Sequence, residues 1–317
     1  MRWIAAAALV LSALLVVPAA GHEAWGDDAR RLEVREGTDG FELRSDRIAG
    51  DTHDRVRLAL DGGNVRLDFD LMESPGATAS EASMRVELER IVEFVDGDGD
   101  GAFDASEDVA AKYDQGDLEL LDIARANVSS GGVEGLQVTA TYSVTGFPGS
   151  TVGFRVTAFG NLTTFEGLQQ SPVELKLDLV LDNFPYTKGD TRPAIELRVK
   201  AEAPNGPEFG AQKVSFTSGT LSASFGWKDT AEVDGAETPV GVTSDRRPDE
   251  VRNGDVESVL SLTFAYARGV NIVHDPTFGF DLLVGVRGDL GFYALGAVAA
   301  AAVFLGLAVA RRGRKAK

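Results

Sequence analysis

Arg55 to Leu71 reads RVRLALDGGNVRLDFDL, a stretch in which apolar and polar residues alternate on both sides of a glycine pair. Side chains of a β-strand point alternately to opposite faces, so the apolar residues of each half would share one face. The Asp-Gly-Gly-Asn step at 61–64 supplies the residues of a tight turn. The stretch therefore predicts a β-hairpin with Arg57, Arg66 and Asp68 toward solvent. Its predicted core-facing residues are Val56, Leu58, Leu60, Val65, Leu67, Phe69 and Leu71.

The same alternation recurs along most of the chain. Val173 to Leu181 reads VELKLDLVL, and Ile195 to Ala203 reads IELRVKAEA. Asp229 to Gly254 is rich in Asp, Glu, Pro and Gly and is expected to form a long exposed loop. Further predicted strands, bounded by Gly, Pro or Ser, are 118–124, 136–144, 152–159, two within 214–227, 256–266 and 278–286.

These strands predict an all-β fold, a β-sandwich over residues 22–288. It would form one large sandwich, or two stacked sandwiches with a boundary near 203–210, where the sequence APNGPEFG breaks the pattern. A chain of 317 residues with 44% hydrophobic residues is long and apolar enough for a packed core. The chain has no cysteine, so no disulfide can staple the fold.

One acidic segment interrupts the strands: Asp96 to Glu107, DGDGDGAFDASE. Calcium is a hard cation that takes six to eight oxygen ligands at roughly 2.3–2.6 Å, and alternating acids on a tightly wound loop can supply them. Gly101 stands where such a loop turns sharply, because glycine reaches positive φ without steric cost. The segment holds five carboxylates and no basic residue, and a divalent cation would relieve their mutual repulsion.

This segment resembles the calcium-binding loop of the EF-hand family, position for position over residues 96–107. The resemblance implies that the three alternating aspartates each give one side-chain oxygen. Ala102 would give its carbonyl, Asp104 would act directly or through a water, and Glu107 would give both oxygens. The implied calcium ligands are Asp96, Asp98, Asp100, Ala102, Asp104 and Glu107. The alternative is a flexible acidic turn in an acidic protein.

The flanks of the segment depart from the EF-hand pattern. Phe103 stands where a smaller aliphatic residue is usual, and Asp108 stands where the second helix usually begins with an apolar residue. The apolar residues of Met84 to Val95 fit one face of a helix. They also fit the two-residue period of a strand, with Arg90 as the exception. Both interpretations stay open, and we favour a calcium loop inserted between strands.

The two ends of the chain predict export and a membrane anchor. Residues 1–21 combine Arg2, an apolar run and small residues, as a cleaved signal peptide does. No charged residue occurs from Gly291 to Ala310, a length that spans about 30 Å as a helix. A transmembrane helix over 289–310 is therefore expected. The basic tail 311–317 would stay cytoplasmic and the N-terminal domain would lie outside the cell.

Together these features predict a calcium-binding, single-pass membrane-anchored cell-surface protein with a structural, adhesive or interaction role. The net charge of −18 disfavours nucleic acid as a partner, whereas a surface protein or a glycan remains suitable. Asn127 and Asn161 begin N-glycosylation sequons, which would be used if the source organism glycosylates.

Two other functions stay open. One is a glycan-binding module that stacks sugars on Phe184, Tyr186 or Trp227; alternatively, the aromatics of the 183–190 loop pack onto the core. The other is a hydrolase on a β scaffold, although the sequence singles out no pair of carboxylates for acid and base. It contains no HExxH, GxSxG or P-loop motif, so we expect no enzyme. His274, before Asp275-Pro276, is expected to mark a rigid turn.

Overall fold

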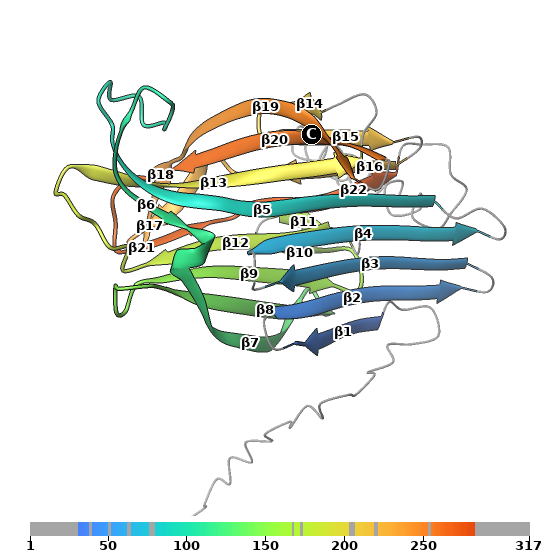
Figure 1. Ribbon diagram of the computed structural model, residues 1–317. Coiled ribbons are helices and arrows are strands. Elements are labelled where there is room, and N and C mark those ends of the chain that lie inside the picture. Colours follow the sequence, from blue (N-terminus) through green and yellow to red (C-terminus); the bar gives the residue numbers. More distant parts are fainter. Residues whose placement is uncertain are drawn as a thin grey trace, which may run out of the picture.

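The structure, a computed structural model, describes residues 31–282 except 38–39, 50–51, 62–64, 76–79, 167, 172–173, 203–206, 219–220 and 253–254. Most of this part is antiparallel β-strand, so the predicted all-β class is confirmed (Figure 1). The expected signal peptide, transmembrane helix and basic tail lie outside the described residues. Among those residues, no helix has the length and apolar character needed to cross a membrane.

The first sheet contains the N-terminal hairpins and three later strands. Its order is β1-β2-β3-β4-β5-β13-β20-β19, and β6 pairs with the end of β5 that β4 leaves free. The strands are β1 (Arg31–Glu36), β2 (Gly40–Ala49), β3 (Thr52–Asp61), β4 (Arg66–Pro75), β5 (Ser80–Val95), β6 (Asp108–Asp114), β13 (Thr191–Glu202), β19 (Gly241–Arg252) and β20 (Asp255–Ala265).

The second sheet is centred on β12. One edge of β12 pairs with β9, followed by β8 and β7, and its other edge is shared by β22 and β21. Strands β16, β15 and β14 continue from β22, and β17 and β18 continue from β21. The strands are β7 (Leu118–Ser130), β8 (Val133–Val144), β9 (Thr151–Phe159), β12 (Glu174–Asp182), β14 (Pro207–Phe209), β15 (Lys213–Ser218), β16 (Leu221–Gly226), β17 (Thr230–Val233), β18 (Ala236–Pro239), β21 (Asn271–His274) and β22 (Thr277–Leu282).

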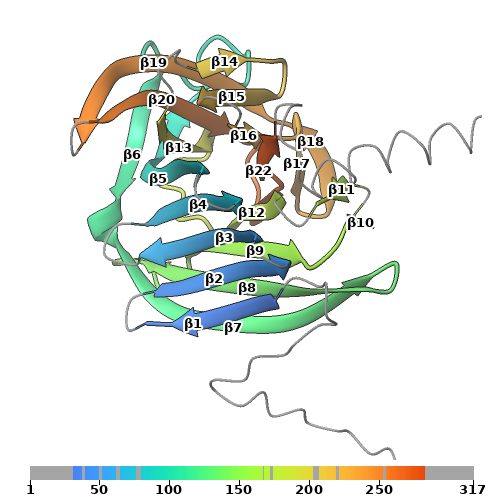
Figure 2. The same cartoon turned by 90° about the vertical axis from the view of Figure 1, so that its right-hand side faces the viewer.

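The two sheets face each other as layers, with β1 and β7 lying together at one side (Figure 2). The chain crosses from the first layer to the second through β6 and the short 3-10 turn η1 (Gln115–Asp117). A separate hairpin, β10 (Thr163–Phe165) and β11 (Leu168–Gln170), lies beside β12, and Phe165 on it packs against Phe159 of β9.

One large hydrophobic cluster fills the space between the layers. The hairpin expected from the sequence is β3 paired with β4, and its core-facing residues from Val56 to Phe69 are buried as predicted. Ala201 and Val214, which flank the expected boundary at 203–210, belong to this same cluster. The described residues on the two sides of that boundary therefore share one core.

A bulge in β5 explains the ambiguous pattern of its residues. The pairing with β13 shifts between Leu88 and Arg90, so Glu89 is an extra residue in the strand. A bulge inverts the alternation of side chains that follows it. Leu88 and Ile91 thus both join the main core, whereas Val92 belongs to a second cluster. The apparent helical period of this stretch came from the bulge.

The expectation of a long loop over Asp229 to Gly254 is wrong. This segment forms β17, β18 and the whole of β19. Among the described strands, β19 pairs with β20 alone and forms the edge of the first sheet, where charged residues and proline are tolerated. Pro248 lies within a shift of the pairing between Arg247 and Glu250, so its missing N–H costs no ladder hydrogen bond.

Candidate calcium loop between β5 and β6

The acidic segment 96–107 connects two strands. It begins directly after β5, which ends at Val95, and ends directly before β6, which starts at Asp108. Strands therefore lie on both sides of this segment, where an EF-hand loop would have helices, and the sequence favoured this arrangement. The charged Asp108 suits this position because it opens a strand and is exposed.

Three of the predicted ligands converge. Carboxylate oxygens of Asp96, Asp98 and Glu107 all lie within 4.8 Å of one another. Asp100 and Asp104 lie outside this group, and both are exposed. Three carboxylates at such separations provide the hard oxygen donors that calcium and magnesium prefer, so the residues present fit a divalent cation.

The backbone of the loop is wound as the sequence predicted. Gly99 and Gly101 have φ values of 78° and 82°, in the left-handed region that glycine reaches without strain. Their amides donate to Asp96 Oδ1 at 3.0 and 3.4 Å, and the amide of Gly97 donates to Glu107 Oε2 at 2.9 Å. These bonds draw the first and last acids of the loop together across its base.

Short local bonds orient the remaining acids. The amide of Ala102 donates to Asp100 Oδ1 at 2.7 Å. The amide and hydroxyl of Ser106 both donate to Asp104 Oδ1 at 2.6 Å, and these bonds hold the pKa of Asp104 below its usual value. Each of these two carboxylates thus uses one oxygen inside the loop, in the manner of an Asx turn.

Arg192 is a part of the site that sequence reasoning missed. Its Nη1 donates to Asp96 Oδ2 at 2.6 Å, and its Nε donates to the Tyr266 carbonyl at 3.1 Å. Burial opposes ionisation of Asp96, but the hydrogen bonds from Arg192 and the loop amides lower its pKa overall. Because Arg192 lies far along the chain on β13, only its pairing opposite Phe94 brings it here.

Phe103 fastens the loop to the outer face of the first sheet. Its ring lies 5.0 Å from that of Phe94, in a small cluster with Val92, Ala194 and Ala265. The Thr243 hydroxyl on β19 donates to the Phe103 carbonyl at 2.9 Å. The bulky residue that departs from the EF-hand pattern therefore has a packing role that an isolated loop would not need.

The aromatic residues of the loop at 183–190 pack onto the core, which is the alternative to a sugar-stacking surface. Phe184 is buried and lies edge-on to Tyr113 and Tyr186, with centroids 5.7 and 4.9 Å away. Arg268 covers the Tyr186 ring at 3.7 Å. Glu93 also holds this loop, accepting bonds from the Thr187 amide at 2.9 Å and hydroxyl at 2.6 Å.

The packing of the aromatics leaves little for stacking sugars. Phe184 is only 7% exposed, and Trp227 packs against Phe225 and Phe264 at centroid distances of 6.1 and 5.8 Å. His274 is fully buried, between the Tyr266 hydroxyl at 3.2 Å and the Lys228 carbonyl at 2.9 Å. Both ring nitrogens of His274 are thus engaged within the fold.

Comparisons with known proteins place the chain in no family. No family model matches it, and no curated protein matches it. Among solved structures, heparan sulfate lyase HepC from Pedobacter heparinus is similar with a TM-score of 0.40 and 7% sequence identity. The similarity covers 80% of this chain and 37% of the lyase chain, so this chain spans well under two thirds of that structure. A similarity of this size carries no conclusion about function.

Proposed function

We propose that the segment 96–107 binds one calcium ion, and that the ion stabilises the fold of an exported cell-surface protein. The observation that carries this proposal is the convergence of Asp96, Asp98 and Glu107 within 4.8 Å. These residues occupy the first, third and twelfth positions of the loop, as in the EF-hand pattern. The pairing of Val95 with Asp108 already brings the ends of the loop together. Asp98 joins them from within the loop, and this third carboxylate is what the loop's own winding adds.

The contacts of the loop support a structural role for the ion. Strands β5 and β6 flank it, Arg192 of β13 holds Asp96, and Thr243 of β19 holds the Phe103 carbonyl. The Arg192 side chain also reaches the Tyr266 carbonyl at the end of β20. An ion that orders the loop would therefore stabilise one end of the first sheet, because five of its strands contact the loop or its partners.

The cellular setting in this proposal rests on the sequence. The apolar N-terminal run would direct export, and the uncharged run before the basic tail would anchor the protein in the membrane. Extracellular modules bind calcium with dissociation constants of about 10⁻⁴–10⁻³ M, which suits calcium levels outside the cell. In this proposal the protein is not an enzyme, and its role is structural, adhesive or interactive.

Thermal melts with calcium and then with a chelator test the proposal. Binding at 100 times the dissociation constant adds about 2.7 kcal/mol to the free energy of unfolding, so calcium should raise the Tm by several degrees. The variants Asp98→Asn and Glu107→Gln should remove this rise, because each takes one charged ligand from the group. Asp122→Asn, an exposed acid on β7, is the matched control and should keep it.

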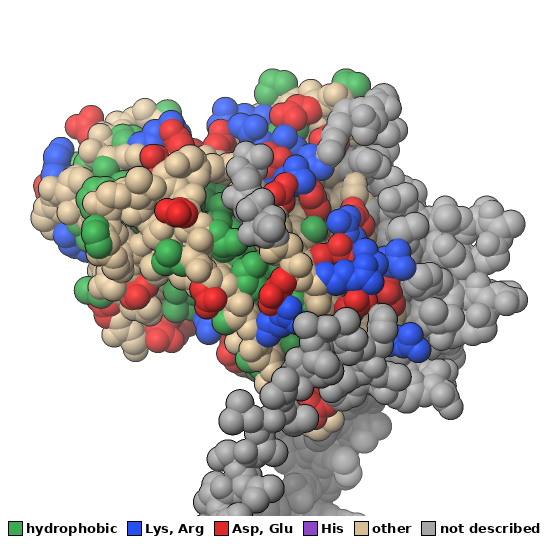
Figure 3. All heavy atoms as spheres, turned by 60° about the horizontal axis from the view of Figure 1, so that its bottom comes forward, with side chains coloured by type: hydrophobic (Ala, Val, Ile, Leu, Met, Phe, Trp, Pro, Cys, Tyr) green, Lys and Arg blue, Asp and Glu red, His purple; other side chains and the backbone are tan. Residues whose placement is uncertain are grey.

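Two results would count against the proposal. A Tm that does not respond to millimolar calcium would mean that the ion does not stabilise the fold. An equal response in wild type, Asp98→Asn and Glu107→Gln would place the calcium effect elsewhere on the surface, where many other Asp and Glu side chains are exposed (Figure 3).

A further inference from the structure

The second sheet forks beside β12, and the fork leaves a hollow on its outer face. Strands β22 and β21 pair with β12 in one continuous register, interrupted only at Asp275 and Pro276. Beyond them, β16 continues the sheet from β22 while β17 continues it from β21. The chain passes from β16 to β17 through residues 227–229, which belong to neither strand.

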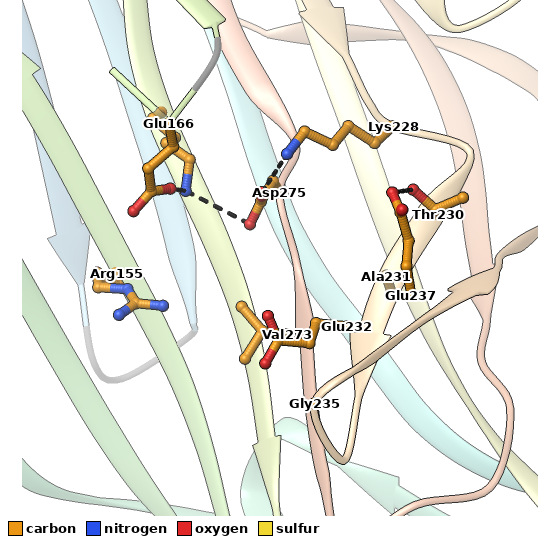
Figure 4. A pocket seen from close by; sticks show the side chains of 11 residues that line it. Arg155, Glu166, Lys228, Thr230, Ala231, Glu232, Gly235, Glu237, Val273 and Asp275 are labelled. Carbon is orange, nitrogen blue, oxygen red and sulfur yellow. Dashed lines mark hydrogen bonds and ion pairs between the residues drawn. The ribbon is translucent and has the colours of Figure 1, made fainter.

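The hollow has a volume of about 570 Å³, within the range of small-molecule sites. The side chains around it are mostly charged (Figure 4). Arg155 lies on one side of the hollow, Glu237 lies on the opposite side beside Thr230, and the Glu232 carboxylate lies between them beside Val273. The β10–β11 hairpin contributes Glu166, and the β17–β18 hairpin contributes both glutamates.

The floor of the hollow is a closed network of ion pairs. Lys176 and Asp178 are 1% and 2% exposed and bond to each other. Lys176 Nζ also contacts Glu166 at 2.6 Å and Asp275 at 3.4 Å, and Lys228 pairs with Asp275 at 2.5 Å. Burial would lower the pKa of Lys176, but these carboxylates raise it overall. The floor charges thus satisfy one another.

Arg155 keeps two donors for a ligand. Its Nε bonds to Asp178 Oδ2 at 2.7 Å, which fixes the guanidinium plane. In the part of the chain that the structure describes, no partner contacts its Nη1 and Nη2. The terminal nitrogens of a guanidinium form a planar fork that matches a carboxylate.

Two carboxylates that line the same hollow lack a cation among the described residues. Glu232 and Glu237 stand directly opposite each other in the β17–β18 hairpin. Like charges in directly opposed positions destabilise a hairpin. Glu237 accepts a bond from the Thr230 hydroxyl at 2.7 Å, but no described residue forms an ion pair with either glutamate. Their carboxylates point in different directions, Glu237 toward Thr230 and Glu232 toward Val273, so an ammonium group between them would offset both negative charges (Figure 4).

We propose that this hollow binds a small organic zwitterion, with its carboxylate on the Arg155 fork and its ammonium between Glu232 and Glu237. A single metal ion is a poorer fit. Among the described residues, the only group of three or more carboxylates close enough to share an ion is the one at Asp96, Asp98 and Glu107. This second site is independent of the calcium proposal, because it shares no residue with the loop.

A titration series with ω-amino acids tests the site. Glycine, γ-aminobutyrate and ε-aminocaproate carry the same two charges at increasing separation, so binding measured by calorimetry should peak at the length that spans the hollow. Caproate and hexylamine each carry one of the two charges and should bind roughly tenfold more weakly, or worse. The titrations use the full chain with saturating calcium, so the loop is in the same state throughout.

Variants separate the site from the general acidity of the protein. The double variant Glu232→Gln/Glu237→Gln should weaken binding of the best amino acid at least roughly tenfold. Arg155→Lys keeps a positive charge beside Asp178 but loses the fork, and it should weaken binding of the carboxylate end. The double variant Glu119→Gln/Asp122→Asn, at two exposed residues of β7, removes the same amount of charge and should leave the affinity for the amino acid unchanged.

Three outcomes would overturn the inference. Hexylamine binding as tightly as the best amino acid would reduce the site to nonspecific cation attraction. Equal losses of affinity in the β7 control and in the Glu232→Gln/Glu237→Gln variant would also show nonspecific attraction. No binding of any probe at millimolar concentration, in a protein that does take up calcium, would leave the hollow without this ligand while the loop proposal stands.

Discussion

Phe103 shows how one side chain ties the acidic loop to the fold. It is 8% exposed and packs on Phe94, although its neighbours in the loop are largely exposed. The loop would otherwise be held mainly by polar contacts, which water competes for. The apolar contact gives the acids a fixed position relative to β5 and β6.

Replacing Phe103 by Ala should destabilise the protein. Truncation of a buried Phe to Ala typically costs about 3–5 kcal/mol, and we expect about 3 kcal/mol in this small cluster. Urea unfolding would measure the loss. Phe209→Ala, at a residue that is 51% exposed, is the control and should cost less than about 1 kcal/mol. Equal losses of unfolding free energy in the two variants would show that the packing of Phe103 does not stabilise the fold.

His274 makes the stability of the core depend on pH. Burial lowers its pKa to about 4. In the neutral ring, Nε2 donates to the Lys228 carbonyl, and Nδ1 accepts a bond from the Tyr266 hydroxyl. In the unfolded chain the pKa returns to about 6.5, so the unfolded state binds the proton first as the pH falls.

This linkage predicts a loss of stability in mild acid. Because the folded-state pKa of His274 is depressed, the stability it contributes is complete above about pH 6.5 and is lost as the pH falls toward 4. Between about pH 8 and pH 5 the loss should be about 2 kcal/mol in the free energy of unfolding. His274→Gln should flatten this dependence in denaturant melts. An unchanged slope in the variant would assign the effect to other groups.

The spacing of the acids could be read from the sequence, but their surroundings could not. Asp96, Asp98 and Glu107 converge because a short loop with left-handed glycines brings nearby residues together. Arg192 pairs with Asp96 only because β13 lies next to β5. Local patterns predict contacts within a turn, whereas contacts between strands depend on a topology that one sequence does not reveal.

Strands were predicted well where apolar and polar residues alternate in a half-buried sheet, as in β3, β4 and β12. They were missed in β17, β18 and β19, whose charged and turn-forming residues suggest a loop. The reason is that β18 and β19 lie at sheet edges, where one side is solvated and needs no apolar pattern. The bulge in β5 similarly made the spacing of its apolar residues resemble that of a helix, so the strand could not be identified from the sequence.

Strand β19 also sets the position of the acidic loop. A Cβ on Gly241, the first residue of β19, would lie 2.1 Å from the carbonyl oxygen of Gly101. Gly241→Ala should therefore push the loop away and weaken calcium binding severalfold in a terbium luminescence titration. Gly116→Ala, where a Cβ would meet nothing within 4 Å, is the control and should bind normally. Equal affinities in both variants would contradict the contact between β19 and the loop.

The two layers share one core, so the described part of the chain should unfold as a unit. Residues from both sheets, and from both sides of 203–210, belong to one hydrophobic cluster. Far-UV circular dichroism and tryptophan fluorescence should give coincident denaturant transitions, and calcium should shift both equally. Two separated transitions, of which only one responds to calcium, would indicate two stacked sandwiches.

The most direct measurement is the calcium content of the purified protein in equilibrium dialysis. A loop in which three carboxylates meet predicts one ion per chain, with a dissociation constant of about 10⁻⁴–10⁻³ M. The Glu107→Gln chain should retain almost none under the same conditions. The proposed site would be contradicted if the wild-type protein took up no calcium at millimolar concentration, or no more calcium than the Glu107→Gln chain.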